Sequence, residues 1–155
     1  MKKIYLLLLP LIFSSCEKSK NCCTVVDTAI EIHYVDENGN NWLNQQELNE
    51  NNINVYFMKE GQKEKIFRGN LDQPKMFSVR KNALGEDALG LSPSDYIENN
   101  KSRTLIEFSS ADVDTVDCLF NTSNSNMICE EVWYNGKPIW DASQNTPRAV
   151  EIVKE

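Results

Sequence analysis

The stretch from residue 114 to 141 constrains the fold most strongly, because it contains the clearest turn in the chain. Tyr134-Asn135-Gly136-Lys137 places an Asn-Gly pair between two apolar-rich runs. A two-residue type I′ turn needs residues that accept positive φ at both central positions, and Asn-Gly is its strongest short-range signal. Upstream, the β-type runs 113–120 and 127–134 are separated by the polar segment 121–126. The region therefore predicts a three-stranded meander.

Short β-type segments separated by turn formers recur along the rest of the chain. They cover residues 24–35, 53–58, 63–68, 76–80, 95–97, 103–108 and 148–153. Residues 81–94 have no usable periodicity and are expected to form an extended loop, while 44–52 suit a loop or one helical turn. This spacing predicts an all-β fold, a single antiparallel β-sandwich of about eight to nine strands, immunoglobulin- or transthyretin-like, over residues 24–155.

The chain begins with the features of an exported protein. Lys2-Lys3 precedes an apolar run from residue 4 to 13, and Ser14-Ser15 then precedes Cys16. Residues 1–15 thus have the pattern of a signal peptide, too short to span a bilayer as a permanent helix. A cysteine directly after small residues resembles the bacterial lipobox, in which that cysteine is acylated and becomes the first mature residue.

Lipidation of Cys16 would make residues 16–23 a short tether and residues 24–155 the folded domain. Two or three acyl chains such as palmitate hold a protein stably on a membrane, whereas one chain binds only marginally. Phe13 stands where the lipobox prefers Leu. The alternative is an ordinary secretory signal that is cut near the same place.

Size and charge narrow the possible functions. Removal of residues 1–15 leaves 140 residues, enough for one domain with a sizeable core. The formal charge falls from −7 to −9 because Lys2 and Lys3 are lost. An acidic protein repels nucleic acids and anionic membrane surfaces, so we exclude nucleic-acid binding.

Export would place the cysteines where disulfides persist. Besides Cys16 they are Cys22, Cys23, Cys118 and Cys129. If the loop spans residues 121–126, Cys118 lies directly opposite Cys129, near the range that a disulfide bridges. We predict that bond, with two buried free thiols as the alternative. The same register sets Asp117 opposite Glu130, a like-charge pair that is unfavourable unless exposed, protonated or bridged by a cation.

The segment that begins at Asp36 has the spacing of a calcium-binding loop. Asp36, Asn38 and Asn40 alternate, and Glu47 lies at the twelfth position, as oxygen ligands do in an EF-hand loop. Such a loop needs Gly at its sixth position, where this chain has Asn41. A β-turn explains the same residues, so a turn and a Ca²⁺ site remain alternatives. The sequence indicates no other cofactor.

Trp133, Tyr134 and Trp140 cluster on the closing hairpin and form a possible ligand platform. Aromatic platforms bind sugars by stacking, but large aromatic residues in a small sandwich also serve as core or cross-strand packing. With Asn135-Gly136 as the turn, Trp133 faces Pro138 and lies diagonal to Trp140 on one face.

The sequence contains no recognisable catalytic constellation. His33 is the single histidine and has no local partner motif, so a Ser-His-Asp or Cys-His system is not indicated. The chain has no Walker loop, GxGxxG, HExxH or GxSxG motif. A carboxylate pair of the glycosidase type stays open because acidic residues are numerous.

Several motifs together resemble a family of small, functionally uncharacterised lipoproteins of Bacteroidota-type bacteria. They are Ser14-Ser15-Cys16, Cys22-Cys23, the run 35–40 with Leu43-Asn44, the strand 53–56, Asp114 to Cys118, Met127 to Cys129, and VWYNGKPIWDA from Val132. The resemblance implies an exported β-sandwich-like domain anchored at the outer membrane, on a leaflet it does not specify. In such bacteria Asp-Thr followed by a small or aliphatic residue resembles an O-glycosylation acceptor, which points to Thr28 and Thr115.

Together these observations predict a lipid-anchored, non-catalytic binding or interaction module of the outer membrane. The alternatives are a carbohydrate-binding accessory lipoprotein and, third, a glycan hydrolase. The expected partners are the membrane, through the anchor, and a glycan or protein.

Overall fold

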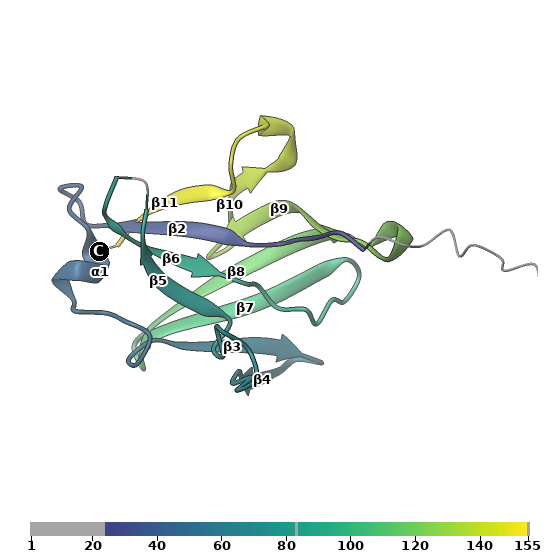
Figure 1. Ribbon diagram of the computed structural model, residues 1–155, viewed down its shortest axis with the longest axis horizontal. Coiled ribbons are helices and arrows are strands. Elements are labelled where there is room, and N and C mark those ends of the chain that lie inside the picture. Colours follow the sequence, from purple (N-terminus) through teal and green to yellow (C-terminus); the bar gives the residue numbers. More distant parts are fainter. Residues whose placement is uncertain (1–23, 83, 155) are drawn as a thin grey trace, which may run out of the picture.

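Two β-sheets make up most of the chain in the computed structural model, which describes residues 24–82 and 84–154. The larger sheet contains β1 (Val26–Asp27), β3 (Asn54–Lys59), β4 (Gln62–Lys65), β7 (Lys101–Ser109), β8 (Asp112–Asn121), β9 (Met127–Tyr134) and β10 (Lys137–Asp141). Its strand order is β1-β9-β8-β7-β3-β4, and β10 also pairs with β9. As Figure 1 shows, the smaller sheet lies across one face of this larger one.

The smaller sheet contains β2 (Ile30–Val35), β5 (Phe77–Lys81), β6 (Asp87–Leu91) and β11 (Ala149–Val153), in the order β11-β2-β6-β5. The remaining elements are one helical turn, α1 (Trp42–Gln45), and the 3₁₀ turns η1 (Ser123–Ser125) and η2 (Ala142–Gln144). The described chain is therefore nearly all β, which confirms the all-β prediction.

Both sheets are mixed, whereas the sequence predicted purely antiparallel pairing. β1 pairs with β9 in parallel, and β11 pairs with β2 in parallel. The expected single strand over residues 24–35 is broken at Thr28-Ala29, and its two parts, β1 and β2, join different sheets. Parallel neighbours need long connections, here most of the chain, so counting outward from hairpin turns could not reveal them.

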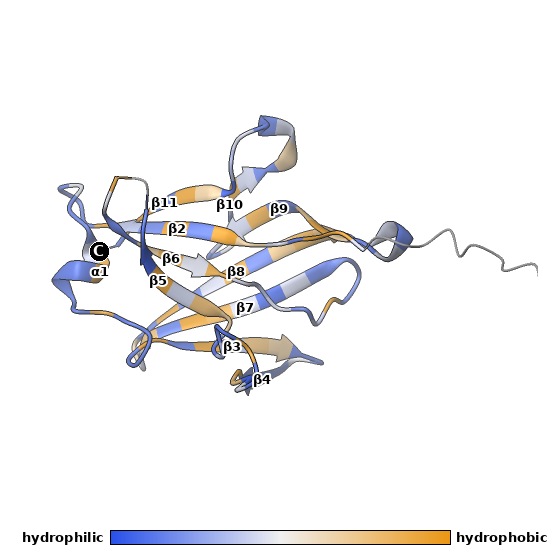
Figure 2. Ribbon diagram, in the orientation of Figure 1, coloured by the Kyte–Doolittle hydropathy of each residue, from blue (hydrophilic) through white to orange (hydrophobic). Residues whose placement is uncertain are grey.

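Alternation of apolar and polar residues places the core between the sheets. Ile30, Ile32 and Tyr34 of β2 are buried, and they share one hydrophobic cluster with inward residues of the larger sheet such as Val116 and Val132. The alternate bands of colour along β7 and β8 in Figure 2 correspond to this pattern. Burial of each large side chain stabilises the fold by about 1.5–3 kcal/mol.

The predicted meander is present, but bulges change its register. β8, β9 and β10 follow one another, with positive φ at Asn135 and Gly136 in the turn between β9 and β10. Leu119 pairs with Glu131, whereas the next residue of β8, Phe120, pairs with Cys129. Glu130 is thus an additional residue on β9, a β-bulge. The predicted opposition of Asp117 to Glu130 is wrong, because Asp117 pairs with Trp133.

A second bulge separates the two tryptophans of the closing hairpin. Trp133 faces Pro138 as predicted, but Trp140 pairs with Val132, which leaves Ile139 as the additional residue on β10. Successive residues of a strand point to opposite faces. Val132 and Trp140 are buried in the core, and Trp133 points to the outer face. The predicted diagonal contact between the tryptophans on one face is therefore wrong.

The expected loop over residues 81–94 contains β6, a buried strand with neighbours on both sides. Leu89 and Leu91 face the core, and Ala88 and Gly90 on the other face are also buried. The Arg80 guanidinium lies over Gly90, where a Cβ would be 3.4 Å from it. A strand covered on both faces does not alternate, which is why periodicity missed it. The short strand predicted at 95–97 is not present.

A buried cation at Lys154 ties the two sheets together. Its Nζ lies 2.5 Å from Asp112 Oδ1 and 3.1 Å from Asp114 Oδ2, both on β8, while Lys154 itself follows β11 of the other sheet. The same Nζ lies 5.1 Å from the Trp42 ring centroid and 4.9 Å from that of Phe108. Only 10% of the Lys154 side chain and 4% of the Asp114 side chain are exposed. These contacts join β8, β11 and α1.

We expect Lys154→Met to lower the free energy of unfolding by about 3 kcal/mol, because it leaves the buried Asp114 carboxylate without its cation. Urea unfolding followed by tryptophan fluorescence measures this change. Lys81→Met is the matched control, since the Lys81 side chain is 60% exposed and its pair with Asp87 lies at the surface. There we expect a loss below about 1 kcal/mol. Equal losses in the two variants would contradict the role of Lys154.

Candidate functional site

The outer face of the larger sheet carries a row of polar and aromatic side chains across four neighbouring strands. Arg103 of β7 pairs with Asp117 of β8, which pairs with Trp133 of β9, which pairs with Pro138 of β10. These residues alternate with buried ones along their strands, so they point away from the core. The register of the sheet thus brings together residues that lie up to 35 positions apart in sequence.

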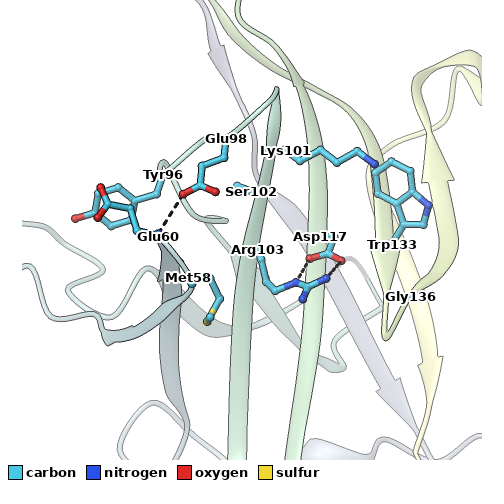
Figure 3. Close-up of a pocket in the computed structure, with 11 residues that line it drawn as sticks. Met58, Glu60, Tyr96, Glu98, Lys101, Ser102, Arg103, Asp117, Trp133 and Gly136 are labelled. Carbon is cyan, nitrogen blue, oxygen red and sulfur yellow. Dashed lines mark hydrogen bonds and ion pairs between the residues drawn. The ribbon is translucent and has the colours of Figure 1, made fainter.

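A hollow of about 440 Å³ lies over this row, and we call it the outer hollow. Its walls come from the β3–β4 turn, the segment before β7, strands β7 to β9, and the β9–β10 turn. The lining residues are Met58, Glu60, Gly61, Tyr96, Glu98, Lys101, Ser102, Arg103, Asp117, Trp133 and Gly136. In Figure 3, Trp133 and Tyr96 lie on opposite sides of the hollow, with Arg103 and Asp117 between them.

The centre of the outer hollow is a bidentate ion pair. Arg103 Nε and Nη2 donate to Asp117 Oδ1 and Oδ2 at 2.7 and 2.8 Å, the dashed lines of Figure 3. The hydrogen bonds and charge of Asp117 raise the pKa of Arg103. Planar, paired polar groups of this kind offer directional donors and acceptors to a ligand. The Arg103 side chain is 55% exposed, so a ligand can reach it.

Trp133 supplies the aromatic wall of the outer hollow. Its ring is half-buried, and Lys101 Nζ lies 4.8 Å from the ring centroid. Tyr96, on the opposite side, has Lys59 Nζ 4.7 Å from its ring centroid and packs edge-on against Phe57. Both rings are therefore held in place by neighbouring side chains.

The charges that line the outer hollow nearly cancel. Lys101 and Arg103 are cationic, while Glu60, Glu98 and Asp117 are anionic. A polyanion would meet three carboxylates, and a polycation would meet two cationic side chains. The hollow therefore suits a ligand with little net charge and several hydroxyl or amide groups.

The structure brings only one residue of the predicted aromatic platform into this site. Tyr134 and Trp140 are 8% and 7% exposed and belong to the core, where Tyr134 donates its hydroxyl hydrogen to Asp114 and Trp140 Nε1 donates to Thr146 O at 3.3 Å. Trp133 alone of the three lines the outer hollow. Sequence reasoning missed Arg103 and Asp117. Counting outward with residue 108 opposite 113 sets Arg103 opposite Cys118, and the irregularity between Glu107 and Ser109 shifts it to Asp117.

Hydrogen bonds within a turn explain the spacing of the residues that suggested a Ca²⁺ site. Asp36 Oδ1 accepts from the backbone N–H groups of Asn38 and Asn40 at 2.9 and 2.8 Å, and Oδ2 accepts from the Asn40 and Gln45 amides at 3.0 and 2.9 Å. These side-chain and backbone donors lower the pKa of Asp36. Glu47 is exposed. Among residues 24–82 and 84–154 no cluster of three or more His, Cys, Asp or Glu is arranged to hold a metal ion.

Both thiols of the predicted disulfide are free and buried in the structure. Cys118 pairs with Val132, and Cys129 pairs with Phe120, so the predicted direct opposition is wrong. The bulge at Glu130 nevertheless turns both side chains into the core from neighbouring strands. A disulfide between them stays a prediction.

The other predicted sites lie apart from the outer hollow. Thr28, in the link between β1 and β2, and Thr115, on the outer face of β8, are both partly accessible. His33 contacts Glu31 Oε1 through Nε2 at 2.8 Å and Asn82 Nδ2 through Nδ1 at 3.1 Å, so both ring nitrogens are engaged. Cys16, Cys22 and Cys23 lie outside the described residues.

Comparison with protein-family models, with curated proteins and with solved structures gave no match. In the part of the chain that the structure describes, no helix is long and apolar enough to cross a membrane.

We expect Ca²⁺ to leave the thermal midpoint unchanged, because N–H donors already occupy the Asp36 carboxylate. Calorimetry in about 10 mM CaCl₂ tests this. That concentration is about 100 times the Kd of a tight extracellular Ca²⁺ site, ~10⁻⁴ M. Binding at that ratio would stabilise the fold by about 2.7 kcal/mol and raise the midpoint by several degrees. MgCl₂ at the same concentration controls for ionic strength. A rise specific to Ca²⁺ would restore the calcium hypothesis.

Proposed function

We propose that this protein is a lipid-anchored, non-catalytic binding module of the outer membrane and that the outer hollow is its binding site. The observation that carries this proposal is the row of Arg103, Asp117 and Trp133, a bidentate polar pair beside an accessible indole. Binding sites typically combine an apolar or aromatic wall with a few placed polar groups. The anchor is supported by Ser14-Ser15-Cys16 after the apolar run and by the resemblance to small lipoproteins.

A non-catalytic role is supported by how the reactive side chains are used. Both nitrogens of His33 contact neighbours on the smaller sheet. In the outer hollow, both oxygens of Asp117 already accept hydrogen bonds from Arg103. The site is thus arranged to hold a ligand.

A carbohydrate is the ligand class that the outer hollow favours. The C–H face of a sugar ring packs against an indole such as Trp133, and vicinal hydroxyl groups can bond to Arg103 and Asp117. The near balance of charge favours a neutral sugar. Trp133 and Tyr96 lie on opposite sides of the outer hollow, with β7 and β8 between them. At about 4.8 Å per strand this is a span of roughly 15 Å. A short oligosaccharide fits that span.

We also propose that the domain belongs to the immunoglobulin- or transthyretin-like class of β-sandwich. Two sheets that share one core support this assignment. The parallel pairs β1–β9 and β2–β11 would be additions to the antiparallel pattern of that class.

Replacement of the lipidated residue tests the anchor. We expect Cys16→Ala to lose acylation and to move from the membrane fraction to the soluble fraction of the cell envelope, because the thiol that accepts the lipid is gone. Metabolic labelling with an alkyne-palmitate analogue and fractionation measure both effects. Cys23→Ala, nearby in the sequence, is the matched control and should stay acylated. A Cys16→Ala protein that remained acylated and membrane-bound would refute the anchor.

Replacement of the indole tests the binding site. Against a neutral oligosaccharide identified on a glycan array, we expect Trp133→Ala to weaken binding about tenfold or more, as loss of a central aromatic contact does. Titration calorimetry measures the Kd. Phe67→Ala is the control, because Phe67 is 70% exposed and lies outside the outer hollow. An array without hits would remove the carbohydrate assignment, and equal affinity of Trp133→Ala and the parent would remove the outer hollow as the site.

A further inference from the structure

Two thiols lie together on the inner face of β8 and β9, behind the outer hollow. Cys118 and Cys129 are 0% and 1% exposed, and both point to the core from neighbouring strands, where Cys118 pairs with Val132 and Cys129 pairs with Phe120. Cys129 Sγ also lies 3.6 Å from the carbonyl oxygen of Glu131, the residue after the bulge. Because Leu119 pairs with Glu131, the bulge at Glu130 is what turns Cys129 to the same face as Cys118.

The two thiols differ in their surroundings. Cys129 lines a second hollow of about 570 Å³ where the two sheets meet, which we call the inter-sheet hollow, whereas Cys118 does not line it. Arg148 lines the same hollow and donates from Nη2 to Cys129 O at 3.4 Å. Its side chain is only 10% exposed, and its Nε is buried without a hydrogen-bond partner among the described residues. A cation is therefore held beside Cys129.

The position of Cys129 makes it the reactive member of the pair. It lines the inter-sheet hollow beside the Arg148 guanidinium, whereas Cys118 does not line that hollow. The Cys118 side chain and the charge of Arg148 lower the pKa of Cys129, and burial and the charge of Asp27 oppose this effect. The thiolate is the nucleophile in disulfide exchange, and a cation beside a thiol favours the thiolate form.

We propose that Cys129 and Cys118 form a dithiol that exchanges with small disulfides entering the inter-sheet hollow, with Cys129 as the attacking thiolate and Cys118 as the resolving thiol. Cys129 S⁻ attacks a disulfide R–S–S–R, an S–S bond to the protein forms, and R–S⁻ leaves. Cys118 then loses its proton to R–S⁻, attacks Cys129 Sγ and displaces the second R–S⁻, which takes a proton from water.

The overall step oxidises the protein dithiol to a disulfide and reduces R–S–S–R to two R–SH, a transfer of two electrons. Its oxidant is a low-molecular-weight disulfide. A disulfide between Cys118 and Cys129 would link β8 to β9. Cys118 pairs with Val132, and the preceding pair of the ladder, Asp117 with Trp133, lines the outer hollow. This proposal is independent of the ligand of that hollow.

Trapping of the mixed disulfide tests the proposal. The full chain, reduced and folded, is treated with 2-hydroxyethyl disulfide, and peptide mass mapping locates the adduct, which separates residues 118 and 129 from the other cysteines. We expect Cys118→Ala to accumulate the adduct at residue 129 at least tenfold faster than Cys129→Ala accumulates it at residue 118. In the parent protein, the peptides that contain Cys118 and Cys129 should together lose two hydrogens and retain no adduct.

Two controls keep the result specific to the proposed roles. Both variants should label equally in denaturant, and matching near-ultraviolet circular dichroism shows that both remain folded. Arg148→Lys should form the adduct at residue 129 faster than Arg148→Met, because Lys keeps a positive charge beside Cys129. Three results would each overturn the proposal. Folded Cys118→Ala could resist labelling, or the two single variants could label equally. In the third, a thiol reductant would fail to open the disulfide of the folded parent protein.

Discussion

The bulge at Glu130 is the local constraint on which the larger sheet and both proposed sites depend. Strict alternation along β9 would place Cys129 on one face and both Val132 and Tyr134 on the other. The additional residue resets the alternation, so all three point into the core. Trp133 is then free to point outward beside Asp117. Without the bulge, the sheet would have to expose Cys129, or expose Val132 and Tyr134 and bury the indole of Trp133 in their place.

The two sheets are held together at both ends of β11 by buried cations. Arg148 precedes this strand and reaches Asp27 on β1, and Lys154 follows it and reaches Asp112 and Asp114 on β8. Each side chain is 10% exposed. A buried ion pair adds little net stability over apolar packing, but loss of one partner is costly, so such pairs fix an arrangement more than they strengthen it. Here they fix how β11 lies against the larger sheet.

Local patterns in the sequence predicted the elements well where the side chains alternate or a turn has a strict backbone requirement. The Asn135-Gly136 turn and the buried face of β2 follow from such patterns. The register could not be predicted, because an additional residue such as Glu130 or Ile139 has no signature of its own and is selected by the core it completes. β6 was missed because burial on both faces removes alternation. For the candidate site, Trp133 could be named, but its companions Arg103 and Asp117 depend on that register.

The strands β8 and β9 carry chemistry on both faces at neighbouring positions. Asp117 pairs with Trp133 on the outside, and the next pair along the ladder, Cys118 with Val132, faces the core. A bond between the thiols would restrain the twist of this strand pair, and strand twist sets the direction in which outward side chains point. A disulfide here would therefore act on the shape of the outer hollow through the backbone of two adjacent residues on each strand. A closely packed core transmits such a change because it has no space to absorb it.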